Sequence, residues 1–125
     1  MSKKILIIDD EDNLRLLERK FLEMAGYTVR EAADGEAGIK IAKEYLPDVV
    51  LLDVIMPKKD GYQVARAFAA DANLARIPII LVTGTSQVVG EGIKLNTQAK
   101  YKLAKPFAKE QLFAIVEKAL TAARD

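Results

Sequence analysis

Three acidic residues stand where apolar, strand-like runs end. Asp9 and Asp10 follow the run at 5–8, and Asp53 follows the run at 49–52. In an open α/β sheet the carboxyl ends of parallel strands meet at one edge, which is where ligands bind. Carboxylates gathered there disfavour one another's ionisation unless a cation lies among them, and Mg²⁺ prefers such oxygen ligands. The spacing therefore predicts a magnesium-dependent acidic pocket.

Two further strand ends supply the other parts of a reaction site. The fourth run ends in Thr83-Gly84, and the fifth ends in Lys105-Pro106. A carboxylate can attack phosphorus while a metal neutralises the developing charge, and an amine and a hydroxyl can hold the phosphoryl oxygens. Gly84 leaves room for the incoming group, and Pro106 restricts Lys105 to an extended backbone. These residue types together predict phosphoryl transfer.

The chain as a whole has the pattern of a doubly wound α/β domain, because strand-like and helix-like stretches alternate five times. We expect a flavodoxin-like, five-stranded parallel sheet of order 2-1-3-4-5 with five helices, in one domain over residues 1–125. The strands are expected at 4–8, 28–32, 49–52, 78–82 and 101–104. The second and fifth are of mixed polarity, which suits the edges of the sheet.

Helical spacing predicts which apolar residues face the core. These are Leu14, Leu17, Phe21 and Met24; Ile39, Ala42 and Leu46; Val64, Ala65, Phe68 and Ala69; and Leu112, Ile115, Val116, Ala119 and Leu120. Asp34-Gly35 and Asp60-Gly61 mark the starts of two of these helices. A helix over 86–96 is expected to be weak because it contains two glycines. The last helix has Ala108 where Ser or Thr would cap best.

Composition excludes several kinds of chemistry. The 125 residues carry a net charge of +1 and include neither cysteine nor histidine. Disulfides, thiolate catalysis, imidazole bases and a phosphohistidine on this chain are therefore excluded. Near-neutral charge disfavours direct nucleic-acid binding, and no run approaches the about 20 apolar residues of a membrane span. We expect a cytoplasmic protein without membrane insertion.

The ordered set of strand-end motifs resembles the receiver domain of bacterial two-component response regulators, and is similar to the single-domain chemotaxis type. The resemblance runs from Lys4 to about Leu120. It rests on Asp9-Asp10, Asp53 with Met56-Pro57 and Asp60-Gly61, Thr83-Gly84, and Lys105-Pro106-Phe107.

The resemblance implies a role for each site residue. Asp53 would be the phosphoacceptor, taking a phosphoryl group from the phosphohistidine of a sensor histidine kinase or phosphotransfer protein. Asp9, Asp10, Asp53 and the backbone carbonyl of Ile55 would hold Mg²⁺. Thr83 and Lys105 would contact the phosphoryl oxygens. The chain would then be a signalling phosphoacceptor that catalyses its own phosphorylation and dephosphorylation, and otherwise no enzyme.

Three positions depart from the family pattern. Lys102 stands where an aromatic residue is usual, with Tyr101 one residue earlier on the opposite face of the strand. Gln98-Ala99 replaces the usual Gly-Ala. Ile55, which with Thr85 flanks the attacking water in this family, offers that water no side-chain hydrogen bond. We therefore expect slow loss of the phosphate.

Output is expected through protein contact on the face formed by residues 86–123, where lysines would favour an acidic partner. One alternative is a phosphate-independent interaction module on the same fold. Flavin-phosphate binding is disfavoured because Asp9 and Asp10 would repel a phosphate. A dehalogenase-type phosphatase would need a second Asp at position 55, which is Ile. Taken alone, Asp9-Asp10 would also suit the start of a helix.

Overall fold

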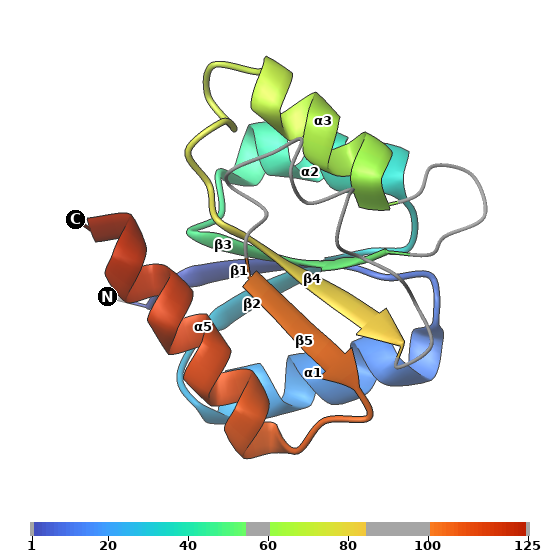
Figure 1. The fold of residues 1–125 in the computed structure, drawn as a ribbon, viewed down its shortest axis with the longest axis vertical. Coiled ribbons are helices and arrows are strands. Elements are labelled where there is room, and N and C mark those ends of the chain that lie inside the picture. The colour runs from blue at the N-terminus through green and yellow to red at the C-terminus, as the bar shows by residue number, and fades with distance from the viewer. Residues whose placement is uncertain (1, 55–60, 85–100, 125) are drawn as a thin grey trace.

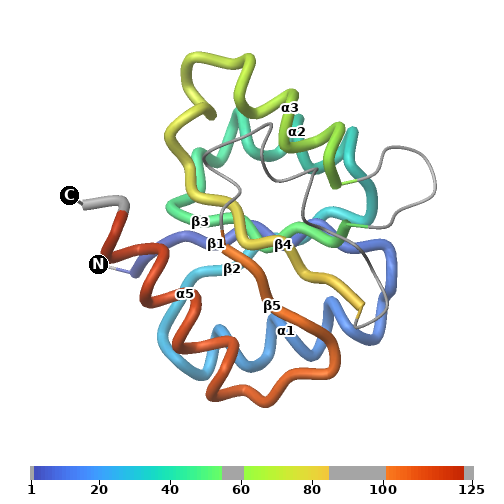
Figure 2. The backbone as a smooth tube through the Cα atoms, viewed as in Figure 1, coloured from blue at the N-terminus to red at the C-terminus, as the bar shows by residue number. Residues whose placement is uncertain are grey.

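The computed structural model describes residues 2–54, 61–84 and 101–124. Five parallel strands form one sheet in the order β2-β1-β3-β4-β5, as predicted. They are β1 (Lys4–Ile8), β2 (Thr28–Ala32), β3 (Val49–Asp53), β4 (Ile79–Gly84) and β5 (Tyr101–Lys105). The two strands of mixed polarity, β2 and β5, lie at the edges, and Figure 2 shows β5 beside β4 at one of them.

Helices cover both faces of the sheet. Those in the described residues are α1 (Asp12–Met24), α2 (Gly35–Tyr45), α3 (Gly61–Ala70) and α5 (Lys109–Arg124). Helices α2 and α3 lie on one face, and α1 and α5 lie on the other (Figure 1). The predicted weak helix at 86–96 falls outside the described residues, so that prediction stays open. Within the described ranges, no helix has the length and apolarity needed to span a membrane.

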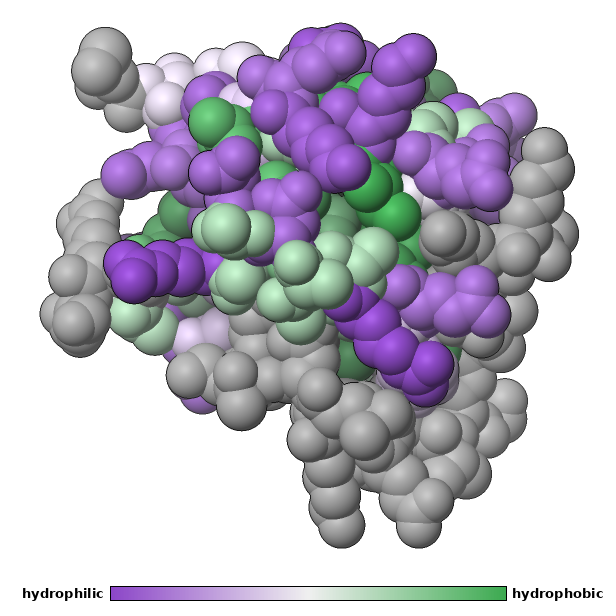
Figure 3. Space-filling model, turned by 90° about the horizontal axis from the view of Figure 1, so that it is seen from above, coloured by the Kyte–Doolittle hydropathy of each residue, from purple (hydrophilic) through white to green (hydrophobic). Residues whose placement is uncertain are grey.

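Each face of the sheet has its own hydrophobic core, because successive strand residues point to opposite sides. In β1, Leu6 and Ile8 pack in the core under α2 and α3, while Ile5 and Ile7 pack in the core under α1 and α5. All four are fully buried. Burial on both faces explains why the central strands are continuous apolar runs. On the α2 and α3 side, hydrophilic residues cover much of the described outer surface (Figure 3).

The inward face of α1 differs from the prediction. Leu17 is 44% exposed and Met24 is 73% exposed, whereas Glu18 and Leu22 are fully buried. The two buried residues of α1, Glu18 and Leu22, are four apart and so lie on one side of the helix. Phe21 packs, partly buried, against the same core as Leu22, which agrees with the prediction. The apolar pattern missed Glu18 because a glutamate is not expected at a buried position.

The two ends of α2 decide whether two further predictions are right. The Asp34 side chain accepts a hydrogen bond from the Ala37 N–H at 2.8 Å, which confirms the predicted start of α2. That helix ends at Tyr45, and Leu46 adopts a left-handed conformation and is 48% exposed. The prediction of Leu46 as a core residue was therefore wrong, and so was that of Ala69, which is exposed.

The start of α5 compensates for its poor cap. The Ala108 N–H donates a hydrogen bond to the Gln111 side chain at 2.7 Å. This is one half of a capping box, in which a side chain three residues on satisfies a free backbone donor.

Candidate functional site

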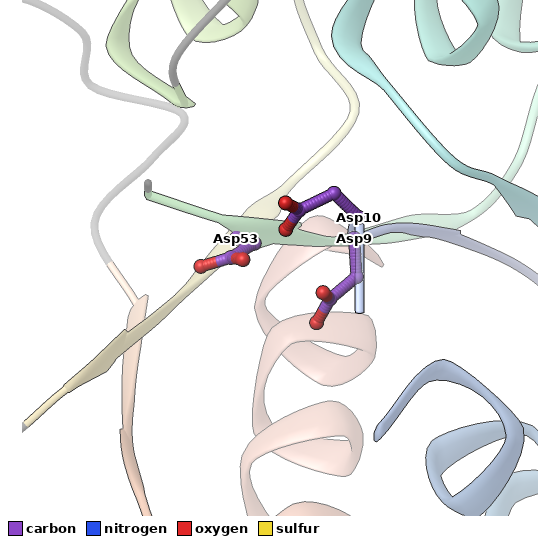
Figure 4. A group of neighbouring side chains, drawn as sticks. All are labelled: Asp9, Asp10 and Asp53. Atoms are coloured by element: carbon purple, nitrogen blue, oxygen red, sulfur yellow. The ribbon is translucent and has the colours of Figure 1, made fainter. Parts of the chain in front are cut away.

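Three carboxylates converge at the carboxyl edge of the sheet. Asp9 and Asp10 follow the end of β1, and Asp53 ends β3 (Figure 4). These two strands are neighbours, and Ile8 pairs with Leu52, which brings the next residues of both strands together. One oxygen from each carboxylate lies within 4.8 Å of the other two. Asp9 and Asp53 are buried, and Asp10 is exposed.

Asp9 is held by the backbone at one side-chain oxygen only. Its Oδ1 accepts a hydrogen bond from the Glu11 N–H at 2.8 Å, while its Oδ2 is buried without a hydrogen-bond partner in the described structure. Burial raises the pKa of Asp9 above its ordinary value, outweighing the Glu11 hydrogen bond and the charge of Lys105. A buried carboxylate oxygen without a donor beside two more carboxylates fits a hard divalent cation.

Lys105 reaches this cluster from the edge strand β5. Its Nζ lies 3.5 Å from Asp53 Oδ1, across the width of β4. The Asp53 side chain is 5% exposed and that of Lys105 is 28% exposed, so the ammonium lies at the mouth of the site. The Lys105–Pro106 peptide bond is cis. At 3.5 Å the contact is a loose ion pair, which leaves the lysine able to accept other anionic partners.

Thr83 and Gly84 complete the site from β4. Asp53 pairs with Val82, so Thr83 lies one residue beyond the phosphoacceptor candidate on the neighbouring strand. Thr83 is buried, and Gly84 pairs with Lys105 and is partly exposed. The structure thus gathers at one sheet edge all the predicted site residues that it describes. Ile55 lies outside the described residues, and its predicted backbone ligand stays a prediction.

Gly61 contributes to the site in a way that sequence reasoning missed. Its N–H donates to the Val54 carbonyl at 2.8 Å. A Cβ at this position would lie 2.7 Å from the Asp53 carbonyl oxygen and 2.8 Å from the Val54 Cα. Only glycine lets the start of α3 approach the end of β3 this closely. The available signal was the Asp60-Gly61 pair, which indicated only a helix start.

A groove opens beside the acid cluster, between the start of α1 and the end of β5. Its volume is about 580 Å³. It is lined by Glu11, Asn13, Leu14, Leu17, Gly84, Lys105, Pro106 and Phe107. Lys105 is therefore shared between the cluster and the groove.

Glu18 is the second feature that sequence reasoning missed. Its side chain is fully buried, and neither carboxylate oxygen has a hydrogen-bond partner in the described part of the chain. Burial, followed by the negative charge of Asp9, raises the pKa of Glu18 to about 8 from its ordinary 4.5. Such a pKa favours the protonated form of Glu18 at neutral pH. The signal that could have found it is its position midway between Leu14 and Leu22.

The comparisons with known proteins agree with this architecture. Residues 5–117 match the family model of the response regulator receiver domain. Since this match covers most of the chain, the chain belongs to that family, which acts in two-component signalling.

Its curated relatives are longer proteins. The chain is 37% identical over 113 residues to the DNA-binding dual master transcriptional regulator RpaA of Synechocystis sp., covering 90% of this chain and 47% of that protein. It is 41% identical over 120 residues to the response regulator PleD of Caulobacter vibrioides, covering 93% of this chain and 26% of that protein. The chain thus spans half or less of the length of these relatives.

Solved structures of similar size share the fold throughout. The chemotaxis protein CheY4 of Vibrio cholerae superposes with a TM-score of 0.89 at 29% identity, covering 96% of this chain and 100% of that one. A CheY-like receiver domain protein of Methanospirillum hungatei gives a TM-score of 0.86 at 28% identity, covering 98% and 97%.

Proposed function

We propose that this receiver domain accepts a phosphoryl group on Asp53, with Mg²⁺, from the phosphohistidine of a sensor histidine kinase or phosphotransfer protein. The observation that carries the proposal is the placement of Asp53. Its buried carboxylate lies among oxygens suited to a cation and 3.5 Å from the Lys105 ammonium. That is the setting in which a carboxylate can act as a nucleophile toward phosphorus.

The reaction joins an Asp53 oxygen to phosphorus as the phosphorus–nitrogen bond of the donor breaks. The leaving imidazole nitrogen keeps the electron pair of that bond. Lys105 turns its ammonium toward the phosphoryl oxygens, and Thr83 donates its hydroxyl to them. Water later attacks the phosphorus, the bond between phosphorus and the Asp53 oxygen breaks, and inorganic phosphate leaves as the carboxylate is restored. The domain would thus catalyse both steps of its own cycle.

Asp9, Asp10, Asp53 and the backbone carbonyl of Ile55 would hold the Mg²⁺. When bound, the ion neutralises negative charge that develops on the transferring group. The chain would keep the Asp53 carboxylate buried and reactive, while Asp9 and Asp10 supply further ligands to the ion. The orphaned Asp9 Oδ2 supports this assignment, because a cation would satisfy it.

The groove beside Lys105 supports the approach of a protein donor. Leu14, Leu17 and Phe107 provide apolar walls next to the lysine that faces Asp53. Leu17 is 44% exposed, so its side chain in this groove is accessible to a partner. We place the phosphohistidine donor here.

The phosphorylated domain would signal through the face formed by residues 86–123, including the predicted helix at 86–96. Exposed Lys102 and Lys118 line a second groove between β5 and α5, which favours an acidic protein partner. RpaA is described as DNA-binding, but the near-neutral charge of this chain favours protein contact as its own output.

A phosphate-independent interaction module is the second candidate. It is favoured by the arrangement of β5, where Tyr101 is buried and Lys102 is exposed. The position that usually holds a movable aromatic residue therefore holds a solvated lysine. Such a surface can bind a partner without coupling that binding to Asp53.

The test is phosphorylation with acetyl phosphate, with and without Mg²⁺, followed by intact-mass measurement. We expect a single, magnesium-dependent, base-labile phosphoryl adduct that disappears in Asp53→Asn. Asp71→Asn, which changes an acid remote from the site, should be phosphorylated like the wild type. Absence of an adduct from the folded wild-type protein, with a small phosphodonor and with a phosphohistidine donor, would favour the interaction module.

A further inference from the structure

Arg15 links the acid cluster to two other parts of the fold. Its Nη1 donates to the Asp9 backbone carbonyl at 2.8 Å. Its Nε donates to Glu31 Oε1 on β2 at 2.8 Å, and its Nη2 donates to Asp12 Oδ1 at 2.7 Å. The side chain is 15% exposed. One guanidinium fork is thus anchored on β2 and on α1 while it holds the end of β1.

The bond to the Asp9 carbonyl bears on the direction of the next residue. The Asp9 N–H continues the sheet by donating to the Ala32 carbonyl at 3.1 Å, so the amide of Asp9 is already held. Its carbonyl belongs to the planar peptide that joins Asp9 to Asp10. Fixing that oxygen fixes the peptide plane and the direction in which Asp10 leaves. Asp10 is the exposed member of the cluster.

The contribution of Arg15 is orientation rather than charge. Its positive charge is matched by two carboxylates, those of Glu31 and Asp12. Arg19 also binds Glu31, with its Nη1 2.6 Å from Oε2. Burial would raise the pKa of Glu31, but the two guanidinium groups outweigh it and hold that pKa below its ordinary value. Glu31 is therefore a charged anchor, and Arg15 transmits its position to Asp9.

We propose that Arg15 is a positioning residue for the magnesium-binding acid cluster, acting through the peptide between Asp9 and Asp10. This inference rests on the proposed function, because the cluster is taken as the metal site. Arg19 provides a matched control. It is an arginine of the same helix with the same glutamate partner, and its hydrogen bonds go to Glu31 and Glu23, away from the acid cluster.

The first experiment compares Mg²⁺ affinities by calorimetry for the wild type, Arg15→Gln and Arg19→Gln. Loss of a group that orients metal ligands typically weakens binding 10- to 100-fold, so we expect about tenfold weaker binding for Arg15→Gln. Arg19→Gln should stay within about twofold of the wild type, since the Asp9 carbonyl keeps its donor. If Arg15→Gln does not fold, Arg15→Lys replaces it, because lysine keeps the charge but loses the fork, and a similar loss is expected.

A second experiment needs neither metal nor phosphate. The amide resonance of Asp10 in a ¹H–¹⁵N spectrum reports the peptide that Arg15 holds. We expect it to move in Arg15→Gln and to stay in place in Arg19→Gln. Equal effects of the two variants on Mg²⁺ affinity, or an unchanged affinity in Arg15→Gln, would overturn the proposal. Failure of the proposed function is recognised separately, because then the wild type itself binds no Mg²⁺ while the Asp10 amide still responds to Arg15.

Discussion

Carboxyl groups lie in two different settings in this domain, one at the carboxyl edge of the sheet and one within α1. The cluster of Asp9, Asp10 and Asp53 receives a backbone N–H, faces an ammonium and has one member in solvent. Glu18 is fully buried, with no partner for either oxygen among the described residues. The same functional group is therefore gathered with two others at the sheet edge in one place, and isolated with its pKa raised to about 8 in the other.

The difference shows that burial alone does not determine the surroundings of a carboxyl group. The cluster lies at the ends of β1 and β3, where the fold supplies donors and access. Glu18 lies in the middle of α1, buried and without a hydrogen-bond donor among the described residues, and the negative charge of Asp9 further disfavours its ionisation. A buried carboxyl group keeps its negative charge where a cation or a hydrogen-bond donor compensates it, and it binds a proton where no such partner is present.

The largest expected effect is a pH dependence of stability that comes from Glu18. The unfolded chain releases this proton near pH 4.5, while the native protein keeps it until about pH 8. Between those values the native state binds more protons, so the free energy of unfolding falls as pH rises. The contribution is at most about 1.4 kcal/mol per pH unit. Below pH 4.5 the stabilisation is fully present.

Replacing Glu18 tests that expectation. Urea unfolding of Glu18→Leu from pH 5 to pH 8 should lack this slope, and the variant should be more stable than the wild type at pH 8 by a few kcal/mol. Glu23→Leu, at an exposed position of the same helix, is the control and should keep the slope of the wild type. Parallel curves for the wild type and Glu18→Leu would mean that Glu18 is ionised in the native state.

The response of stability to Mg²⁺ should distinguish the acid cluster from Glu18. At a hundredfold excess over its dissociation constant, a ligand of the native state stabilises it by about 2.7 kcal/mol. We expect thermal unfolding of the wild type and of Glu18→Leu to shift upward equally with Mg²⁺. Asp10→Asn should lose most of the shift. A reduced shift in Glu18→Leu would show that Glu18 takes part in metal binding. Glu18 and the acid cluster would then not differ in this respect.

Gly61→Ala should disturb the cluster through the backbone. The added methyl would meet the Asp53 carbonyl oxygen at 2.7 Å, and relieving such overpacking costs about 1–3 kcal/mol. Chemical denaturation should show this loss, and the Mg²⁺ affinity should fall because the end of β3 moves. An unchanged affinity at reduced stability would confine the role of Gly61 to packing.

The smallest effect is expected at Glu23, one of the solvent-exposed acids of α1. Glu23 pairs with Arg19 at 3.3 Å, with both side chains substantially exposed. Glu23→Gln should change the free energy of unfolding by about 0.5 kcal/mol or less, since exposed ion pairs contribute little. The same denaturation assay measures it, and a cost of several kcal/mol would contradict the assignment of Glu23 to the solvated face.

Much of the site could be predicted because few interactions determine it. Continuous apolar runs identified the central strands, and parallel α/β topology places their carboxyl ends together. Asp9, Asp53, Thr83 and Lys105 therefore came to one sheet edge as expected. Two predictions, the helix at 86–96 and the Ile55 carbonyl ligand, lie outside the described residues and stay predictions.

The sequence by itself determined where the central strands lie and which residue types stand at the strand ends, because hydrophobic periodicity is a local property that can be read along the chain. Only the tertiary structure decided which side of α1 faces the sheet, and with it the burial of Glu18 and the reach of Arg15 to Asp9. It also decided the close approach of Gly61 to Asp53. These features depend on how helices rotate and seat against the sheet, and that is set by contacts between residues distant in sequence, which no pattern along the chain contains.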